Sequence, residues 1–119
     1  MGKNYLGEFE ELILLAILSL GPNAYGVTIT DALVNVGKSV STGALYTALS
    51  RLEEKGFIRS WMGEATAERG GRAKKYFAVE ALGQQALSEA ENTRRAFQTK
   101  LGMGGVSAFG SISILNNAQ

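Results

Sequence analysis

Cysteine and histidine are both absent from this sequence of 119 residues. Their absence excludes thiolate nucleophiles, disulfide bonds and imidazole general bases, and it removes the usual ligands of zinc. The neighbouring carboxylates Glu10-Glu11 and Glu53-Glu54 lie in stretches with helical periodicity, where acids belong to solvated faces. The sequence therefore predicts a protein that is not an enzyme and that uses no cofactor or metal.

Long apolar runs are also missing. The run from Ile13 to Leu18 is far too short to span a bilayer, and the start of the chain meets acid at Glu8 instead of a secretory apolar region. We therefore expect a cytoplasmic protein with no membrane partner. The length suits one small domain with an extension, and dimerisation would bury more surface than so small a domain buries alone.

Net charge is only +1, but the charges are unevenly distributed. Residues 1–37 hold one base against four acids, residues 38–75 hold eight bases against four acids, and residues 76–119 hold three of each. The eight bases are Lys38, Arg51, Lys55, Arg59, Arg69, Arg72, Lys74 and Lys75. This asymmetry is expected of a chain whose middle part faces nucleic acid.

Two helices are predicted in the first third of the chain. From Glu8 to Leu20, apolar residues follow the helical period and occupy nearly the whole circumference. Such a helix must be covered on more than one side. One side is expected to face the core of its own domain, and a partner subunit is a candidate for covering the other. Gly21-Pro22-Asn23 ends this helix, and a second helix with a single apolar face follows from Tyr25 to Val36.

The stretch from Ser39 to Gly56 predicts a third helix. Leu45, Leu49 and Leu52 recur at helical spacing, Ser39 or Ser41 can cap its start, and Gly56 suits a left-handed C′ position. The polar face carries Ser41, Thr42, Gly43, Tyr46, Thr47 and Ser50, followed by Arg51. Short hydrogen-bonding side chains beside small residues suit a helix that enters the DNA major groove, although an ordinary amphipathic surface helix shows the same pattern.

Residues 57–62 and 75–79 are rich in aromatic and β-branched residues and predict two strands. The connection between them is polar and contains Gly70-Gly71 at its expected tip. The candidate DNA-binding residues of the hairpin are Arg69, Gly70, Arg72, Lys74 and Lys75. Glycine lets a backbone approach closely and the cations can meet phosphates, so the hairpin is a candidate wing. A plain solvated hairpin is the alternative.

A last helix is predicted after Glu80, with a heptad seam formed by Leu87, Ala90, Arg94, Phe97 and Leu101. The seam would pack on a partner subunit, on the first helix, or on both. Together with Phe9, Leu14 and Leu18 of the first helix, it makes the expected dimer interface. We expect a DNA-binding domain over residues 1–79, a dimerisation helix over 80–101 and a flexible uncharged tail over 102–119.

In this order, the elements resemble the PadR family of winged helix-turn-helix transcriptional regulators, in particular its smaller subfamily with one C-terminal helix. The resemblance rests on the stretches Leu6–Glu10, Ala24–Gly26, Ser41–Tyr46, Leu49–Ile58 and Arg69–Phe77. It implies a mostly α fold with a small β-hairpin, namely a winged helix-turn-helix followed by a dimerisation helix. It further implies a homodimer on a pseudo-palindromic operator, usually as a repressor, sometimes released by a small apolar or aromatic effector.

Matched residue by residue, the resemblance assigns Ser41, Thr42, Gly43, Tyr46 and Thr47 to the recognition helix, and Arg69, Gly70, Arg72 and Lys74 to the wing. Two positions depart from the family. Glu80 stands where a capping Thr is frequent, and the only tryptophan, Trp61, lies on a strand, so a tryptophan-lined ligand pocket on the last helix is not carried over.

Several alternatives stay open at this point. Tyr46 could contact phosphate or be a packed aromatic residue, and Arg51 could contact phosphate or pair with Glu54. Tyr5, Leu14, Leu18 and Phe97 could line an effector cavity between subunits or simply fill the interface. The whole domain could instead be a winged-helix module for protein–protein contact, its basic hairpin meeting an acidic partner.

Overall fold

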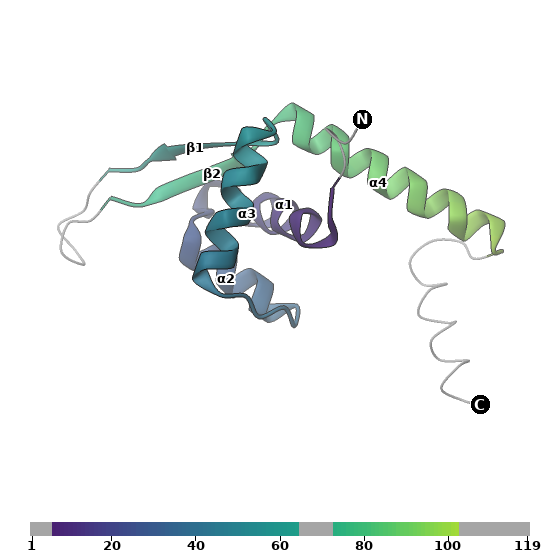
Figure 1. Cartoon of the computed structure of the whole chain (residues 1–119), viewed down its shortest axis with the longest axis horizontal. Coiled ribbons are helices and arrows are strands. Elements are labelled where there is room, and N and C mark those ends of the chain that lie inside the picture. Colours follow the sequence, from purple (N-terminus) through teal and green to yellow (C-terminus); the bar gives the residue numbers. More distant parts are fainter. Residues whose placement is uncertain (1–5, 65–72, 103–119) are drawn as a thin grey trace. The chain divides into compact units, whose positions relative to one another are not determined.

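The computed structural model describes residues 6–64 and 73–102 and begins with helix α1, Glu8–Leu20 (Figure 1). Its bounds are those predicted from the apolar period. The side chain of Glu10 points back to the start of the helix, where its carboxylate accepts a hydrogen bond from the Gly7 amide at 3.2 Å. Acids in the first turn are stabilised by the positive end of the helix dipole. Gly21 ends α1 in a positive-φ conformation and opens the short 3₁₀ helix η1, Gly21–Asn23.

Helix α2 spans Gly26–Asn35, one residue shorter at each end than predicted. At its start the Thr28 hydroxyl accepts from the Tyr25 amide at 3.0 Å and lies 2.6 Å from the Asn23 carbonyl. At its end the amides of Gly37 and Lys38 bond back to the carbonyls of Val34 and Leu33, both at 2.8 Å. This pair of bonds is a Schellman motif, and it requires the positive φ that Gly37 adopts.

Helix α3 spans Thr42–Glu54 within the predicted stretch. Ser41, one of the two predicted caps, accepts from the Ala44 amide at 3.1 Å. The helix ends in a second Schellman motif, in which Gly56 and Phe57 donate to Glu53 and Leu52 at 3.0 and 2.9 Å. Gly56 has φ +80°, as its predicted C′ position requires. Phe57 is thereby turned into the core and leads directly into the first strand.

Strands β1, Ile58–Met62, and β2, Lys75–Val79, form an antiparallel hairpin with Ile58 opposite Val79 and Met62 opposite Lys75. The segment before α2 extends the sheet by one bridge, between Tyr25 and Tyr76, and the Phe77 amide donates to the Ala24 carbonyl at 2.9 Å. The hairpin is therefore attached by backbone bonds to the start of α2.

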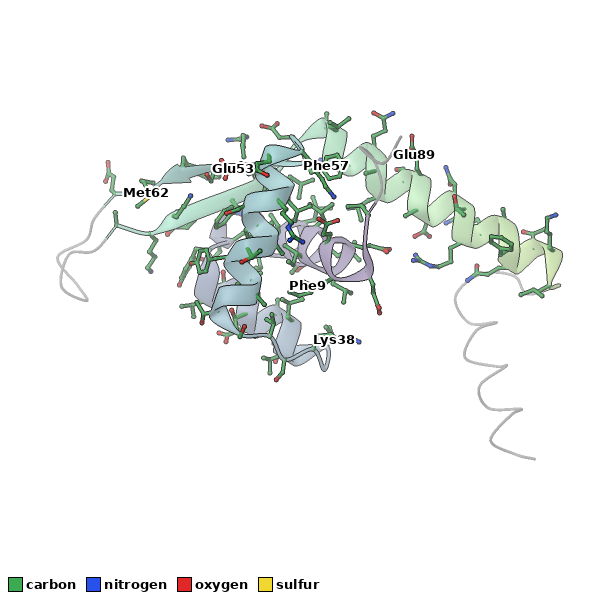
Figure 2. The ribbon with its side chains drawn as sticks, viewed as in Figure 1. Phe9, Lys38, Glu53, Phe57, Met62 and Glu89 are labelled. Carbon is green, nitrogen blue, oxygen red and sulfur yellow. The ribbon has the colours of Figure 1, made fainter. Side chains whose placement is uncertain are left out.

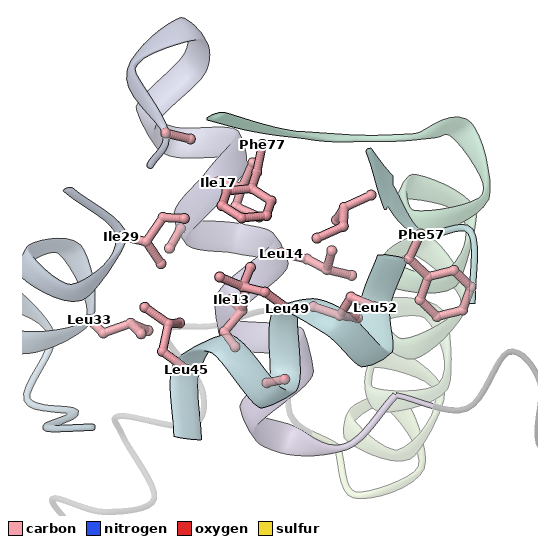
Figure 3. Close-up of a cluster of buried hydrophobic side chains, with 14 of the residues drawn as sticks. Ile13, Leu14, Ile17, Ile29, Leu33, Leu45, Leu49, Leu52, Phe57 and Phe77 are labelled. Atoms are coloured by element: carbon pink, nitrogen blue, oxygen red, sulfur yellow. The ribbon is translucent and has the colours of Figure 1, made fainter. Parts of the chain in front are cut away.

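The core gathers around α1, which contacts α2, α3 and β2. Figure 3 shows its large side chains converging from these elements and from Phe57, directly before β1. The fully buried ones are Ile13, Leu14, Ile17, Ile29, Leu33, Leu45, Leu49, Leu52 and Phe57. None of the buried residues in the described part of the chain is polar or charged, so this core is apolar throughout.

Helix α4 spans Ala81–Lys100 and belongs to two compact units. Its first turns, to Leu87, are part of the unit that holds the core, where Gly83 and Ala86 are buried. The rest of the helix, from Ser88, belongs to a second unit, in which Arg95 pairs with Glu91 at 2.8 Å. No helix in the described part of the chain is long and apolar enough to cross a membrane.

Candidate nucleic-acid interface

Helix α3 has two chemically distinct faces. Leu45, Ala48, Leu49 and Leu52 are buried. The side chains predicted to meet DNA are all exposed, namely Ser41, Thr42, Gly43, Tyr46, Thr47, Ser50 and Arg51. No ion pair joins Arg51 to Glu54 in the part of the chain that the structure describes. The structure thus brings the predicted recognition residues onto one free helix face, while their contact with DNA stays a prediction.

The first turn of α3 offers room for close approach. A Cβ atom added to Gly43 would meet no atom within 4 Å, so this position faces open space. Ser41 uses its oxygen to cap the helix but keeps its hydroxyl proton as a donor. A backbone without side chains in the way can lie closer to a groove wall or a phosphate than one bearing side chains.

Tyr46 packs against the start of α2 and yet remains 42% exposed. A Cβ atom at Gly26 would lie 3.1 Å from Tyr46 Cζ and would contact its hydroxyl directly. The ring therefore rests on the bare backbone of Gly26, beside a pocket of about 240 Å³. The pocket is lined by Gly26, Val27, Thr30, Asp31, Thr42 and Tyr46. Tyr46 is therefore packed against α2 and accessible to solvent at once. The structure is compatible with both predicted roles, the packed aromatic residue and the phosphate contact.

Lys75 begins β2 and pairs with Met62, the last residue of β1, which Figure 2 labels. Lys74 comes directly before β2. The Gly63 amide donates to the Lys74 carbonyl at 2.7 Å, which continues the ladder beyond the named strands. The remaining predicted wing residues, Arg69, Gly70 and Arg72, lie outside the described residues. The described stem therefore contributes two of the predicted wing cations.

Not every cation in the basic middle of the sequence is available to DNA. Lys55 Nζ lies 3.0 Å from both carboxylate oxygens of Glu10, and Arg59 Nε lies 3.6 Å from a carboxylate oxygen of Glu80. Lys38 stands on the exposed turn between α2 and α3 (Figure 2). Counting charges along the sequence overestimates the positive charge of this surface, because acids from distant segments fold back onto two of the bases.

An aromatic cluster next to the hairpin was not predicted as part of the site. The rings of Trp61 and Tyr76 are stacked with centroids 6.1 Å apart, and Tyr25 meets Tyr76 edge-on at 5.4 Å. Lys74 and Arg59 lie over the rings of Tyr25 and Trp61. The sequence does indicate strands that contain aromatic residues. Which rings meet depends on the register of the hairpin and on the position of Tyr25, which precedes α2.

The predicted dimer residues separate into buried and exposed groups. Leu14 is fully buried in the core of its own chain, so its assignment to the dimer interface was wrong. A helix that is apolar all round gives no indication of which face its own domain covers; Leu15 and Leu18 are the residues that point outward, at 46% and 44% exposure. Phe9 is half-buried against the core.

Within α4, Leu87 and Ala90 are half-buried, while Arg94 and Phe97 are exposed. Leu101, directly after the helix, is exposed as well. Phe97 and Leu101 are 63% and 69% exposed. Leu14 cannot line an effector cavity between subunits, since its side chain is enclosed by its own chain, and Tyr5 lies outside the described residues.

Helices α1 to α3 followed by an antiparallel hairpin define a winged helix-turn-helix, a class of DNA-binding fold. Residues 14–89, more than half of the sequence, match the family model of the transcriptional regulator PadR-like family. The chain belongs to this family of transcriptional regulators, which are not enzymes. The mostly helical fold predicted from the sequence is thereby confirmed.

Solved structures agree with this assignment. A PadR-like transcription factor from Bacteroides fragilis is 26% identical, with a TM-score of 0.65 over 79% of this chain and 86% of that one. A PadR family regulator from Eggerthella lenta is 26% identical, with a TM-score of 0.61 over 80% and 83%. A PadR-like regulator from Bacillus cereus, 24% identical, shares the fold with a TM-score of 0.62 over 79% and 87%. A search of curated protein sequences found no significant match.

Proposed function

We propose that this PadR-like regulator is a repressor that binds a pseudo-palindromic operator as a homodimer. The observation that carries the proposal is the exposed polar face of α3, which lies opposite a fully buried leucine face and has open space at Gly43. In this arrangement α3 reads base edges in the major groove, while Lys74 and Lys75 neutralise backbone phosphates beside it.

Exposed apolar residues at the end of α4 and directly after it support the dimer. Phe97 and Leu101 continue a heptad spacing from Leu87, and both are more than 60% exposed in the single chain. Large apolar side chains grouped at such spacing are typical of a helix that packs on another helix. A second copy of α4 would cover them, and the two α3 helices would then meet two half-sites.

The test is binding to DNA from immediately upstream of the regulator's own gene, measured by gel shift with scrambled duplex as competitor. We expect upstream DNA to be retained when scrambled DNA is in excess. If no duplex is bound even at low salt, DNA recognition is overturned in favour of a winged-helix module for protein contact. Mapping of bound genomic fragments then gives the operator, and its half-site spacing reports the dimer geometry.

Repression and effector release are tested separately. Deletion of the gene should raise transcription from the bound promoter; a fall would mean activation. Release by a small apolar or aromatic ligand is tested by thermal stabilisation with a hydrophobic ligand panel, since a ligand that binds only the folded protein raises its melting temperature.

A further inference from the structure

The ammonium group of Lys74 contacts the uncharged side chain of Tyr25. Its Nζ lies 4.5 Å from the centroid of the Tyr25 ring and 3.5 Å from the Tyr25 hydroxyl oxygen. An ammonium group over an aromatic face is attracted by the ring quadrupole, and the attraction strengthens when water is partly excluded. Lys74 is half-buried, so the contact restricts a side chain that is otherwise among the most flexible.

This anchoring differs from that of Lys55 and Arg59. Lys75 resembles Lys74 in this respect, because it lies over the Phe77 ring at 5.9 Å and has no ion pair within the described residues. Lys55 and Arg59 also lie over rings, but each faces a carboxylate as well, Glu10 at 3.0 Å and Glu80 at 3.6 Å. Lys74 has no ion pair within residues 6–64 and 73–102. A ring restrains a cation without cancelling its charge, so the Lys74 ammonium stays able to attract an anion.

Tyr25 is itself held from the hairpin side. Its ring meets Tyr76 edge-on with centroids 5.4 Å apart, and the two residues form a backbone bridge. Tyr76 stacks in turn on Trp61. Gly63 makes room for it, because a Cβ there would lie 2.5 Å from Tyr76 Cε1. The cluster therefore fixes the Tyr25 ring on the stem of the hairpin.

Tyr25 and its neighbour Gly26 also join the two DNA-facing elements. The Tyr46 ring of α3 packs on the backbone of Gly26, and the Lys74 ammonium lies over the ring of Tyr25. The Tyr25 amide is bonded to the Thr28 hydroxyl at 3.0 Å, which ties the pair to the first turn of α2. Two adjacent residues thus support one side chain of the recognition helix and one cation of the hairpin.

We propose that Tyr25 is a positioning residue for DNA binding. It holds the ammonium of Lys74, which has no ion pair among the described residues, at a set place relative to α3 so that it meets a backbone phosphate. The proposal rests on the DNA-binding function proposed above and adds a residue to it. Because Lys74 is restrained before DNA arrives, less side-chain entropy is lost when the phosphate contact forms.

The test uses the full chain and a fluorescently labelled random-sequence duplex, whose binding is electrostatic and needs no known operator. Anisotropy titrations over a range of salt concentrations compare wild type with Lys74→Met, which keeps length and removes charge. We expect Lys74→Met to reduce the slope of log affinity against log salt by about 0.9 for each chain bound. An unchanged slope would overturn the role of Lys74.

Tyr25 is then tested by a double-mutant cycle. Tyr25→Leu should weaken binding about two- to fivefold, and Lys74→Met should have a clearly smaller effect in the Tyr25→Leu background than in wild type. Lys75→Met is the matched control, because Lys75 is the neighbouring cation and makes no contact with Tyr25 in the described structure. Its effect should be equal in both backgrounds. Equal effects of Lys74→Met in both backgrounds would overturn the proposal.

Two substitutions at position 25 that keep the shape of the ring distinguish loss of the cation–ring attraction from loss of folding. Tyr25→Phe keeps the ring face, whereas pentafluorophenylalanine at position 25 keeps the ring shape and reverses its quadrupole. We expect the coupling to Lys74 to persist in the first and vanish in the second; persistence in both would contradict the cation–ring mechanism. If wild type itself binds no duplex, the proposed function fails, whereas wild-type binding without coupling refutes only the role of Tyr25.

Discussion

The same substitution, glycine to alanine, should have opposite effects at two helical positions of this chain. Alanine is the better helix former, so each change alone favours its helix by up to about 1 kcal/mol. At Gly43 the new methyl group meets nothing within 4 Å. At Gly83 it would lie 2.9 Å from Val79 Cγ1 and 3.1 Å from the Phe57 carbonyl carbon, and it would contact the Phe57 carbonyl oxygen directly.

The Phe57 carbonyl cannot move away freely, because it accepts the Glu80 amide at 2.8 Å, directly before α4. Overpacking of this kind costs about 1–3 kcal/mol, and loss of the hydrogen bond adds about 1 kcal/mol. After subtraction of the helix-propensity gain, Gly83→Ala should destabilise the fold by about 1–3 kcal/mol. Gly43→Ala should stabilise it by about 0.5 kcal/mol.

Urea unfolding followed by far-UV circular dichroism and by Trp61 fluorescence, at one protein concentration, measures both changes. Trp61 is the only tryptophan of the sequence, so its signal is unambiguous. In thermal unfolding followed by the same two signals, the midpoint temperature should fall by about 4–15 °C for Gly83→Ala and rise by a few degrees for Gly43→Ala. If Gly83→Ala were as stable as wild type, the close packing of α4 on the hairpin base would be refuted.

Three further outcomes follow from the same structure. Thr47→Ala should change which operator sequence is preferred, by about 1–3 kcal/mol at one base pair, and equal loss on all sequences would argue against base readout. Glu10→Gln removes the partly buried partner of Lys55 and should lower the free energy of unfolding by about 1 kcal/mol in urea titrations; no change would mean the ion pair contributes nothing. Phe97→Glu should shift sedimentation from dimer to monomer, and a retained dimer would exclude this part of α4 from the interface.

Much of the fold was predictable because the local signals agree. The apolar period sets the bounds of α1, and Gly37 and Gly56 end α2 and α3 because only a positive φ completes their Schellman motifs. The exposed face of α3 was predictable for the same reason: Leu45, Leu49 and Leu52 have to be buried, and the residues between them then point outward.

The site was less predictable where it depends on segments that meet only after folding. Glu10 and Glu80 come from opposite ends of the first unit to pair with Lys55 and Arg59, so the sum of charges along residues 38–75 misjudged the surface. Leu14 was assigned to a partner because periodicity shows that a residue is apolar and does not show which neighbour covers it.

The sequence by itself determined the helices, the hairpin and the polar face of α3, since each follows from propensity, periodicity and capping within a few residues. Only the tertiary structure decided that Leu14 belongs to the core and that Tyr25 holds Lys74. Both depend on the directions in which distant segments approach each other, and those directions are set by packing of the whole core around α1 and by the register of the hairpin.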